Sequence, residues 1–173
     1  GPNDQTGKAR AVLDENFAAV TKWLLSGHQD FNFINESMLP ALTKEDAPRM
    51  VGQMEYDAIV VAGCKTLRQT TLDYLSAFQK AGGKVIFMGD CPVYVDGILS
   101  DGANDLFQKS VSISFGCAML VESLEENREI RILNSKGQNE GKVLYNYRQD
   151  GEVRWLFIAT AENSVRIATP MLR

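Results

Sequence analysis

The sequence has 173 residues, of which 45% are hydrophobic and 23% are charged, and its 18 basic and 22 acidic residues leave a net charge of -4. This length fits one domain, and the composition is that of an ordinary globular protein. No apolar run approaches the roughly 18 residues of a membrane span, and no lysine or arginine stripe indicates nucleic-acid binding, so we expect a soluble domain with neither partner.

The three cysteines, Cys64, Cys91 and Cys117, lie far apart and form no CxxC motif. An odd number without that motif argues against a disulfide framework and against a structural zinc site. No signal peptide is visible at the start, where Gly1-Pro2 resembles a tag-cleavage scar, and the chain ends abruptly after β-like sequence. We expect a cytoplasmic protein without cofactor or metal, and a piece of a longer polypeptide.

The first predicted element is an amphipathic helix over 9–26. Apolar residues recur there at spacings of three and four, namely Val12, Phe17, Val20, Trp23 and Leu24, and Gly27 follows as a stop signal. His28 is expected to be exposed or to cap this helix rather than to bind a ligand. A short strand is expected over Phe31–Asn35, followed by a loop and a short polar helix.

A βαβ unit is predicted between Tyr56 and Met88. The continuous apolar run Tyr56–Gly63 predicts a central strand of a parallel sheet, and Lys84–Met88 predicts the next buried strand. Between them lies a helix capped by Thr70, which ends at Gly82-Gly83 and whose inward face comprises Leu72, Leu75, Phe78 and Ala81. A right-handed crossover makes the two strands parallel, so we expect a doubly wound, mainly parallel α/β sheet.

The remaining sequence predicts two short helices around the β-prone "VSISF", and from Arg128 the apolar pattern changes to period two. Strands are expected in "REIRIL", "KVLYNY" and "EVRWLFIATA", with Asp150-Gly151 as a hairpin turn. In this hairpin Val143, Tyr145 and Tyr147 are expected opposite Val153, Trp155 and Phe157. We divide the chain into a linker (1–8), an α/β core (9–127) and a C-terminal β extension (128–173).

Ligands of open α/β sheets sit beyond the carboxyl ends of the strands, which here are followed by Gly63 and Gly89. The stretches "YDAIVVAGC" and "KVIFMGDCPVYV" resemble class I glutamine amidotransferases, and Cys91 falls on that family's catalytic cysteine. The resemblance is degenerate, because Pro92 has no N–H to donate to an oxyanion and no His-x-Glu motif follows late in the chain. Cys91 is therefore expected to be a relic of a nucleophile.

Other candidate site residues lie in the same loops. The glycine loop at Gly63 could bind an anion, but such turns occur throughout this fold class. Two of the four carboxylates Glu36, Asp90, Asp96 and Asp101 could act on a glycosidic bond, and Tyr94 could stack on a sugar ring. Ordinary surface or half-buried positions explain each of these residues more simply.

Over about residues 13–161 the sequence resembles the amidotransferase-like domains embedded in large bacterial glycoside hydrolases, and it is similar in plan to the trimerisation domain of a β-galactosidase family. The most specific match is "YDAIVVAGC...LRQTTLDYLSAFQKAGGKVIFMG". The resemblance implies a flavodoxin-like layer without amidotransferase chemistry. It also implies a sheet strand before the first helix, which this chain does not contain, so we expect an uncovered sheet edge or one filled by another segment or copy.

We therefore expect a non-catalytic accessory domain of a carbohydrate-active enzyme, with a role in architecture, oligomerisation or placement of the substrate groove. Its partners would be other domains of the parent polypeptide, further copies of itself or carbohydrate. Two alternatives remain open: a thiol-dependent hydrolase or amidotransferase-type enzyme that uses Cys91, and a sugar-binding module.

Overall fold

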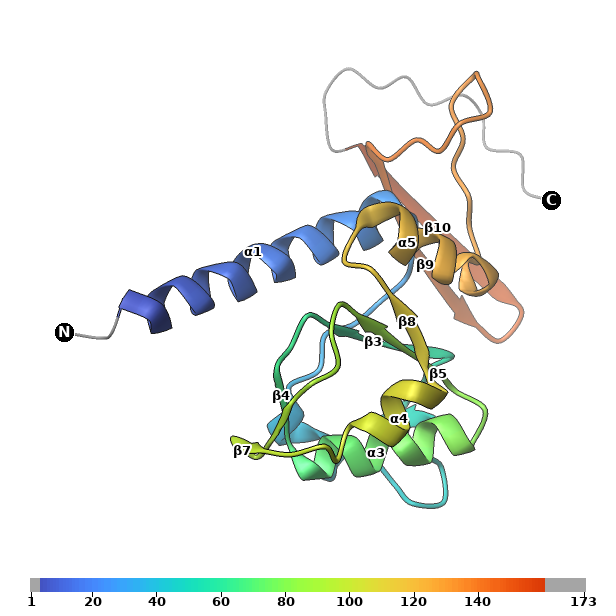
Figure 1. Ribbon diagram of the computed structural model, residues 1–173. Coiled ribbons are helices and arrows are strands. Elements are labelled where there is room, and N and C mark those ends of the chain that lie inside the picture. Colours follow the sequence, from blue (N-terminus) through green and yellow to red (C-terminus); the bar gives the residue numbers. More distant parts are fainter. Residues whose placement is uncertain (1–3, 161–173) are drawn as a thin grey trace.

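The structure is a computed structural model and describes residues 4–160. Its centre is a parallel sheet of β3 (Ala58–Ala62), β5 (Lys84–Met88) and β8 (Val111–Ile113), in the order β3-β5-β8. Figure 1 shows helices on both faces of this sheet, and an antiparallel hairpin follows near the C-terminus. The predicted mixed α/β class with a parallel sheet and a C-terminal antiparallel hairpin is therefore confirmed.

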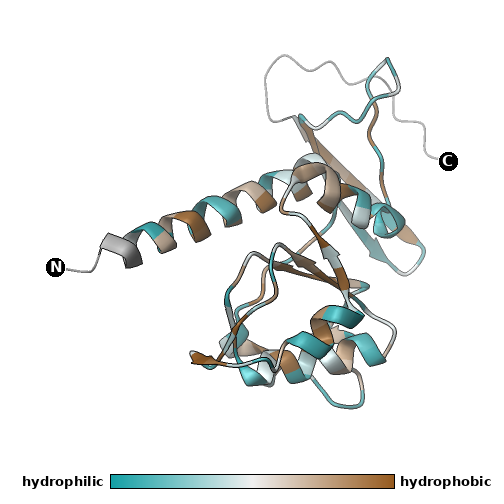
Figure 2. Cartoon of the chain, viewed as in Figure 1, coloured by the Kyte–Doolittle hydropathy of each residue, from teal (hydrophilic) through white to brown (hydrophobic). Residues whose placement is uncertain are grey.

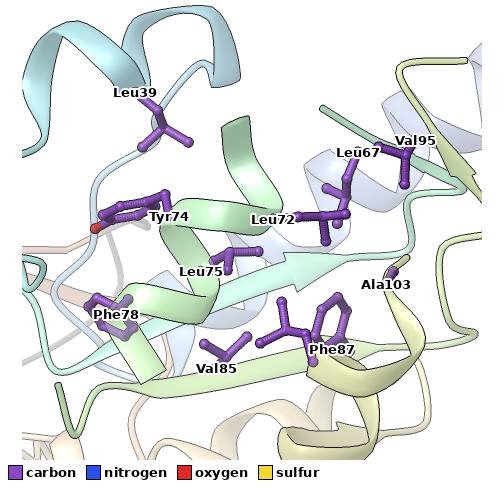
Figure 3. Packing of buried hydrophobic residues seen from close by; sticks show 11 residues of the cluster. Leu39, Leu67, Leu72, Tyr74, Leu75, Phe78, Val85, Phe87, Val95 and Ala103 are labelled. Carbon is purple, nitrogen blue, oxygen red and sulfur yellow. The ribbon is translucent and has the colours of Figure 1, made fainter. Parts of the chain in front are cut away.

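Two hydrophobic clusters pack on opposite faces of β5, because successive side chains of a strand point to opposite sides. Val85 and Phe87 face α3 (Gln69–Lys80) and α4 (Asn104–Lys109), as Figure 3 shows for part of this cluster. Ile86 and Met88 face α1 (Asp4–Ser26) and α5 (Cys117–Ser123). All four side chains are at most 1% exposed, so β5 is the true central strand.

Strand β3 was predicted to be central, and this prediction is wrong. All five residues of β3 are only half-buried, and within residues 4–160 the strand pairs with β5 on one side and with no strand on the other. Its continuous apolar pattern indicates that both faces of the strand are covered by helices. The pattern does not indicate whether a strand pairs with each of its two edges.

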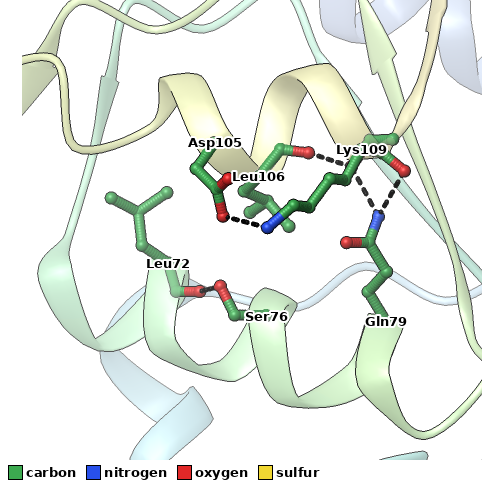
Figure 4. A network of polar contacts seen from close by, with 7 residues as sticks. Leu72, Ser76, Gln79, Asp105, Leu106 and Lys109 are labelled. Atoms are coloured by element: carbon green, nitrogen blue, oxygen red, sulfur yellow. Dashed lines mark hydrogen bonds and ion pairs between the residues drawn. The ribbon is translucent and has the colours of Figure 1, made fainter.

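Helix α3 has most of the predicted inward face, with Leu72, Leu75 and Phe78 buried. Ala81, predicted on the same face, is exposed and follows the last helical residue, just before Gly82 and Gly83. Its N-cap is Arg68 instead of the predicted Thr70, and the side chain of Arg68 makes no capping hydrogen bond. Near its other end Gln79 Nε2 donates to Lys109 O (3.0 Å) and to Ser110 Oγ (2.9 Å), which ties α3 to the end of α4 (Figure 4).

Helix α1 starts earlier than the predicted residue 9 and is only partly covered. Val20 and Leu24 are buried against the sheet, but Val12, Leu13 and Phe17 are 54%, 49% and 56% exposed. Figures 1 and 2 show the reason, because the N-terminal half of α1 projects past the sheet. The apolar stripe of α1 (Val12, Leu13 and Phe17) thus continues the buried face but stays largely exposed, although the ring of Phe33 lies against that of Phe17.

His28 ends helix α1 in the left-handed conformation, with φ 55°. The N–H of Gln29 donates to Leu24 O (3.0 Å) and that of His28 to Leu25 O (3.1 Å), the hydrogen-bond pattern of a Schellman cap. The predicted capping role is confirmed. The alternative of an exposed His28 is wrong, because the residue is 1% exposed.

The strand predicted at Phe31–Asn35 is not formed. The chain there is irregular and leads into η1 (Glu36–Met38) and α2 (Leu39–Leu42), followed by the small ribbon of β1 (Met50–Val51) and β2 (Met54–Glu55). A strand needs a neighbour to satisfy its backbone, and no described strand lies next to this segment in a ladder.

A second small sheet stands at the carboxyl ends of the parallel strands. It contains β4 (Thr66–Leu67), β6 (Tyr94–Val95) and β7 (Ile98–Leu99), in the order β4-β6-β7. The predicted β-prone segment forms β8, and the two short helices beside it form α4 and α5, with η2 (Glu125–Asn127) after α5. The predicted strand "REIRIL" is reduced to one bridge between Leu133 and Asn139.

The C-terminal hairpin pairs β9 (Val143–Asp150) with β10 (Val153–Thr160) in a register different from the predicted one. Tyr145 lies opposite Ile158 and Tyr147 opposite Leu156, whereas Trp155 lies opposite Arg148. The predicted sharing of one face by the tyrosines with Trp155 and Phe157 is therefore wrong. The two-residue turn is Gly151-Glu152 instead of the predicted Asp150-Gly151, and the register places Tyr145 and Tyr147 on the face of Ile158 and Leu156. The last part of the predicted extension, 161–173, lies outside the described residues.

Candidate functional site

The loops after β3 and β5 lie side by side, as expected from parallel strands. The N–H of Gly63 donates to Met88 O (3.0 Å) and that of Gly89 to Ile113 O (2.8 Å), so each ladder continues one residue into its loop. Both glycines have positive φ, 61° and 90°, where a side chain would be strained. The chain thus turns sharply just before Cys64 and Asp90.

Cys91 is not placed as a nucleophile. Its Sγ–H donates to Asn104 Oδ1 (3.3 Å) and to Pro92 O (3.5 Å), so its hydrogen bonds go to acceptors that cannot remove a proton. Burial raises the pKa of the Cys91 thiol, which disfavours the reactive thiolate. His28, the one histidine of the sequence, is held elsewhere by the carbonyl oxygens of Glu140 and Val143.

The backbone around Cys91 also lacks the form of a nucleophile elbow. In such an elbow the nucleophile sits in a strained turn directly between a strand and a helix. Among the described non-glycine residues, positive φ occurs at His28 and Asp96, not at Cys91. The buried Pro92 follows, and the chain then enters β6, so no helix begins directly after the cysteine as it does in an elbow.

Two candidate carboxylates meet at the start of α3. Glu36 Oε1 accepts from the N–H of Arg68 (3.2 Å), and Asp96 Oδ1 accepts from the N–H of Gln69 (3.3 Å). These N–H groups belong to the first turn of a helix and have no partner inside it. Glu36 and Asp96 therefore cap α3 from distant parts of the chain, which explains why the helix needs no local cap at Thr70.

Cys64 lies in the same region, and its surroundings disfavour the thiolate. Burial raises the pKa of its thiol to about 11, and the nearby Glu36 carboxylate adds to this effect. A negative charge beside the sulfur opposes formation of the thiolate. The structure therefore brings Gly63, Cys64, Glu36 and Asp96 together in an arrangement that supports the fold rather than acid, base or thiol chemistry.

The other two candidates are exposed. Asp90 and Tyr94 both lie at the surface, with Tyr94 38% exposed beside the depression of about 480 Å³ lined by Val93, Leu99, Ser100, Asp101 and Asn104. Asn104 was missed by the sequence analysis, since an asparagine at the start of a short helix carries no special signal. The depression is shallow, and its described lining contains no buried charged group.

The feature that sequence reasoning missed most clearly is the amount of apolar surface left open. Exposed side chains gather on α1, on β6–β7 (Ile98 73%, Leu99 74%) and on β10 (Trp155 44%, Phe157 61%). These exposed surfaces have the same periodic apolar patterns as buried faces. The sequence alone therefore does not distinguish an exposed apolar face from a buried one. Within residues 4–160, no helix combines the length and apolarity that a membrane crossing requires.

Neither a protein-family model nor a curated protein sequence matches this chain. Among solved structures, the chain is similar to apo exo-carrageenase GH42 from Bacteroides ovatus, with 13% sequence identity and a TM-score of 0.40. The similarity covers 78% of this chain and 17% of that one. This chain therefore corresponds to a small part of the length of the carrageenase.

Proposed function

We propose that this chain is a non-catalytic accessory domain of a larger carbohydrate-active enzyme, in which it serves architecture and assembly. The sequence resemblance to domains embedded in glycoside hydrolases suggests the enzyme class and a flavodoxin-like form of the sheet. The observation that carries the assembly role is that, within residues 4–160, the outer edge of β3 is unpaired and the apolar stripe of α1 beside it is largely exposed.

The outer edge of β3 carries backbone N–H and C=O groups that could hydrogen-bond to a further strand. Alternate N–H and C=O groups of an edge strand point away from the sheet, and a free edge is a ready template for pairing. The side chains of β3 are half-buried, whereas those of Val85 to Met88 in β5 are at most 1% exposed. One more strand would complete the burial of β3.

The segment 31–36 is hydrogen-bonded to residues before and after β3 and does not pair with it. Asn32 Nδ2 donates to the hydroxyl of Tyr56, just before β3 (2.9 Å), and Glu36 Oε1 accepts from the N–H of Arg68, beyond the end of β3 (3.2 Å). The rings of Phe17 and Phe33 lie 4.5 Å apart, so this segment and the α1 stripe form one apolar surface. A strand on β3 would be covered by this surface.

The chemistry of the loops supports a non-catalytic role. An enzyme that uses Cys91 would need a base and a depressed thiol pKa, whereas this sulfur hydrogen-bonds to an amide oxygen and its pKa is raised by burial. The carboxylates Glu36 and Asp96 are occupied by backbone N–H groups of α3. In this proposal the partner is an apolar extended strand from the rest of the parent polypeptide.

Hydrogen exchange tests this proposal directly. The amides of Ala58–Ala62 are compared between this chain alone and a longer natural polypeptide that contains it. We expect exchange of the outward amides of β3 to slow by about tenfold or more in the longer protein, because new ladder bonds protect them. The amides of β5 serve as the internal control, since they are already paired on both sides.

A matched pair of variants locates the effect. In the longer polypeptide, Leu13→Ser with Phe17→Ser should remove the added protection of β3, whereas Ile98→Ser with Leu99→Ser on β7 should leave it intact. Unchanged exchange of β3 in the longer protein would refute the proposal. A rise in melting temperature of the isolated chain with millimolar oligosaccharide would favour the sugar-binding alternative instead.

A further inference from the structure

Within residues 4–160, the outer edge of β10 has little of the usual protection, with Arg154 as its one charged residue. It pairs with β9 over all eight residues, Val153 with Asp150 through Thr160 with Val143, without a bulge, and no other strand within residues 4–160 pairs with it. Proteins protect such edges with proline, lysine, bulges or a covering element. The sequence "VRWLFIAT" contains neither proline nor lysine.

The outward face of the hairpin divides into an apolar row and a polar row. Val153, Trp155 and Phe157 of β10 are 54%, 44% and 61% exposed. The residues opposite them on β9 are Asp150, Arg148 and Asn146. The apolar row therefore lies at the free edge, and the polar row lies on the side already paired.

This arrangement is self-complementary. If a second β10 lies antiparallel to the first about a two-fold axis at Leu156, Trp155 stands opposite Phe157 of the second copy, and Val153 stands opposite its Ala159. Residues on the same face then meet, because both members of each pair are separated from Leu156 by the same number of residues. Apolar side chains contact apolar ones, and the polar rows of the two β9 strands lie outside them.

We propose that the outer edge of β10 pairs with the same strand of a second copy of this chain, which forms a continuous four-stranded antiparallel sheet. A two-fold contact uses the same surface on both copies, as this pairing does. Cross-strand aromatic pairs stabilise antiparallel sheets, and a two-stranded hairpin gains from further strands because it is marginally stable alone. The contact brings no like charges together. Arg154 is the one charged residue among positions 153–159, and it lies opposite Ile158 of the second copy.

The expected dimer is weak. Pairing along one strand buries less surface than the roughly 1,200 to 2,000 Å² of a stable interface, so association should depend on concentration. We expect half-association at about 10 to 100 µM. This inference goes beyond the proposed accessory role, because it concerns β10 rather than β3. The isolated chain can dimerise whether or not a longer polypeptide protects β3. An experiment can therefore refute either proposal without refuting the other.

Complementary charge variants test the pairing in the full chain. One variant carries Trp155→Lys and Phe157→Lys, and the other carries Trp155→Glu and Phe157→Glu. Each alone places like charges opposite each other across the two-fold axis, whereas a mixture places lysine opposite glutamate. Sedimentation velocity over a concentration series measures association, and far-UV circular dichroism checks that each variant is folded.

We expect the wild type to dimerise, each charge variant to shift half-association at least about tenfold higher, and the mixture to restore a mixed dimer. Ile98→Lys with Leu99→Lys is the control, because these side chains are even more exposed but lie on β7; it should behave like the wild type. A wild type that stays monomeric, an equal loss in the β7 control, or no recovery in the mixture would overturn the proposal. If a double variant fails to fold, Phe157→Ser alone, at a position 61% exposed, supplies the same comparison with the wild type.

Discussion

Nε2 of His28 lies 3.0 Å from the carbonyl oxygen of Val143, which is 115 residues later in the chain. The same nitrogen lies 3.2 Å from Glu140 O. Because carbonyl oxygens only accept hydrogen bonds, Nε2 must carry the proton, and the imidazole joins the end of α1 to the start of β9. Nδ1 is buried without a partner among the described residues.

Replacing His28 should destabilise the protein by two separable effects. His28→Gly keeps the left-handed backbone but removes the ring and its hydrogen bonds, at a cost of about 2 to 3 kcal/mol. His28→Ala adds strain of about 1 kcal/mol at φ 55°. Urea denaturation measures both. Equal stability of the two variants would contradict the backbone contribution, and a cost below about 0.5 kcal/mol for either would contradict the link to β9.

The three thiols should react with a maleimide or disulfide reagent in a defined order near pH 7.5. Cys117 is exposed and should react first. Cys91, whose pKa is raised by burial, should react slowly, and Cys64, with a pKa of about 11, should react most slowly. Peptide mass spectrometry after timed quenching measures each rate. Fastest labelling at Cys91 would instead support the thiol-enzyme alternative.

Stability should fall in the alkaline range through Tyr145. Burial raises the pKa of its hydroxyl to about 12, with further contributions from the carboxylates of Asp30 and Glu129, and the hydroxyl donates to His28 O (3.3 Å). A raised folded-state pKa means that the folded protein holds the proton more tightly. The contribution to stability is therefore complete below about pH 10 and is lost as the pH rises toward 12.

Tyr145→Phe removes this titrating group and should flatten the decline of stability between about pH 10 and pH 12. Urea denaturation at several pH values measures the slope. Tyr147→Phe, on the same strand and face, is the matched control and should retain the slope of the wild type. An identical slope in Tyr145→Phe and the wild type would show that Tyr145 is not responsible.

Adjacent glycines after α3 should respond differently to alanine. A Cβ at Gly83 would lie 2.2 Å from Cε1 of Phe78, which is 0% exposed, so Gly83→Ala should overpack the core at a cost of about 2 to 3 kcal/mol. Gly82 has open space around a Cβ but a φ of 87°, so Gly82→Ala should cost about 1 kcal/mol through strain. Thermal unfolding compares them. A milder effect at Gly83 than at Gly82 would contradict the packing argument.

The local elements of the βαβ unit could be predicted because their signals are local. The run Lys84–Met88 is a strand with the predicted bounds, and the inward face of α3 follows from its helical spacing. The glycines at 63 and 89 were correctly singled out as turns, since both need positive φ. The departures of Pro92 and the single histidine from an amidotransferase site were likewise visible in the sequence.

The roles of the candidate site residues depended on distant contacts. Glu36 and Asp96 looked like free carboxylates, but each accepts a hydrogen bond from the start of α3 across 32 and 27 residues of sequence. Such caps cannot be predicted from spacing, because the loops that bring them together have no periodic signal. The same is true of His28, whose partners lie in β9.

The sequence by itself determined the mixed α/β class, the parallel βαβ unit and the presence of a C-terminal hairpin, because helix and strand periods follow from neighbouring residues. Only the tertiary structure decided that β5 rather than β3 is central, that Trp155 faces Arg148 rather than a tyrosine, and that half of α1 is uncovered. A pattern of apolar residues states which face can be buried. Whether it is buried, and in which register, depends on the element that packs against it.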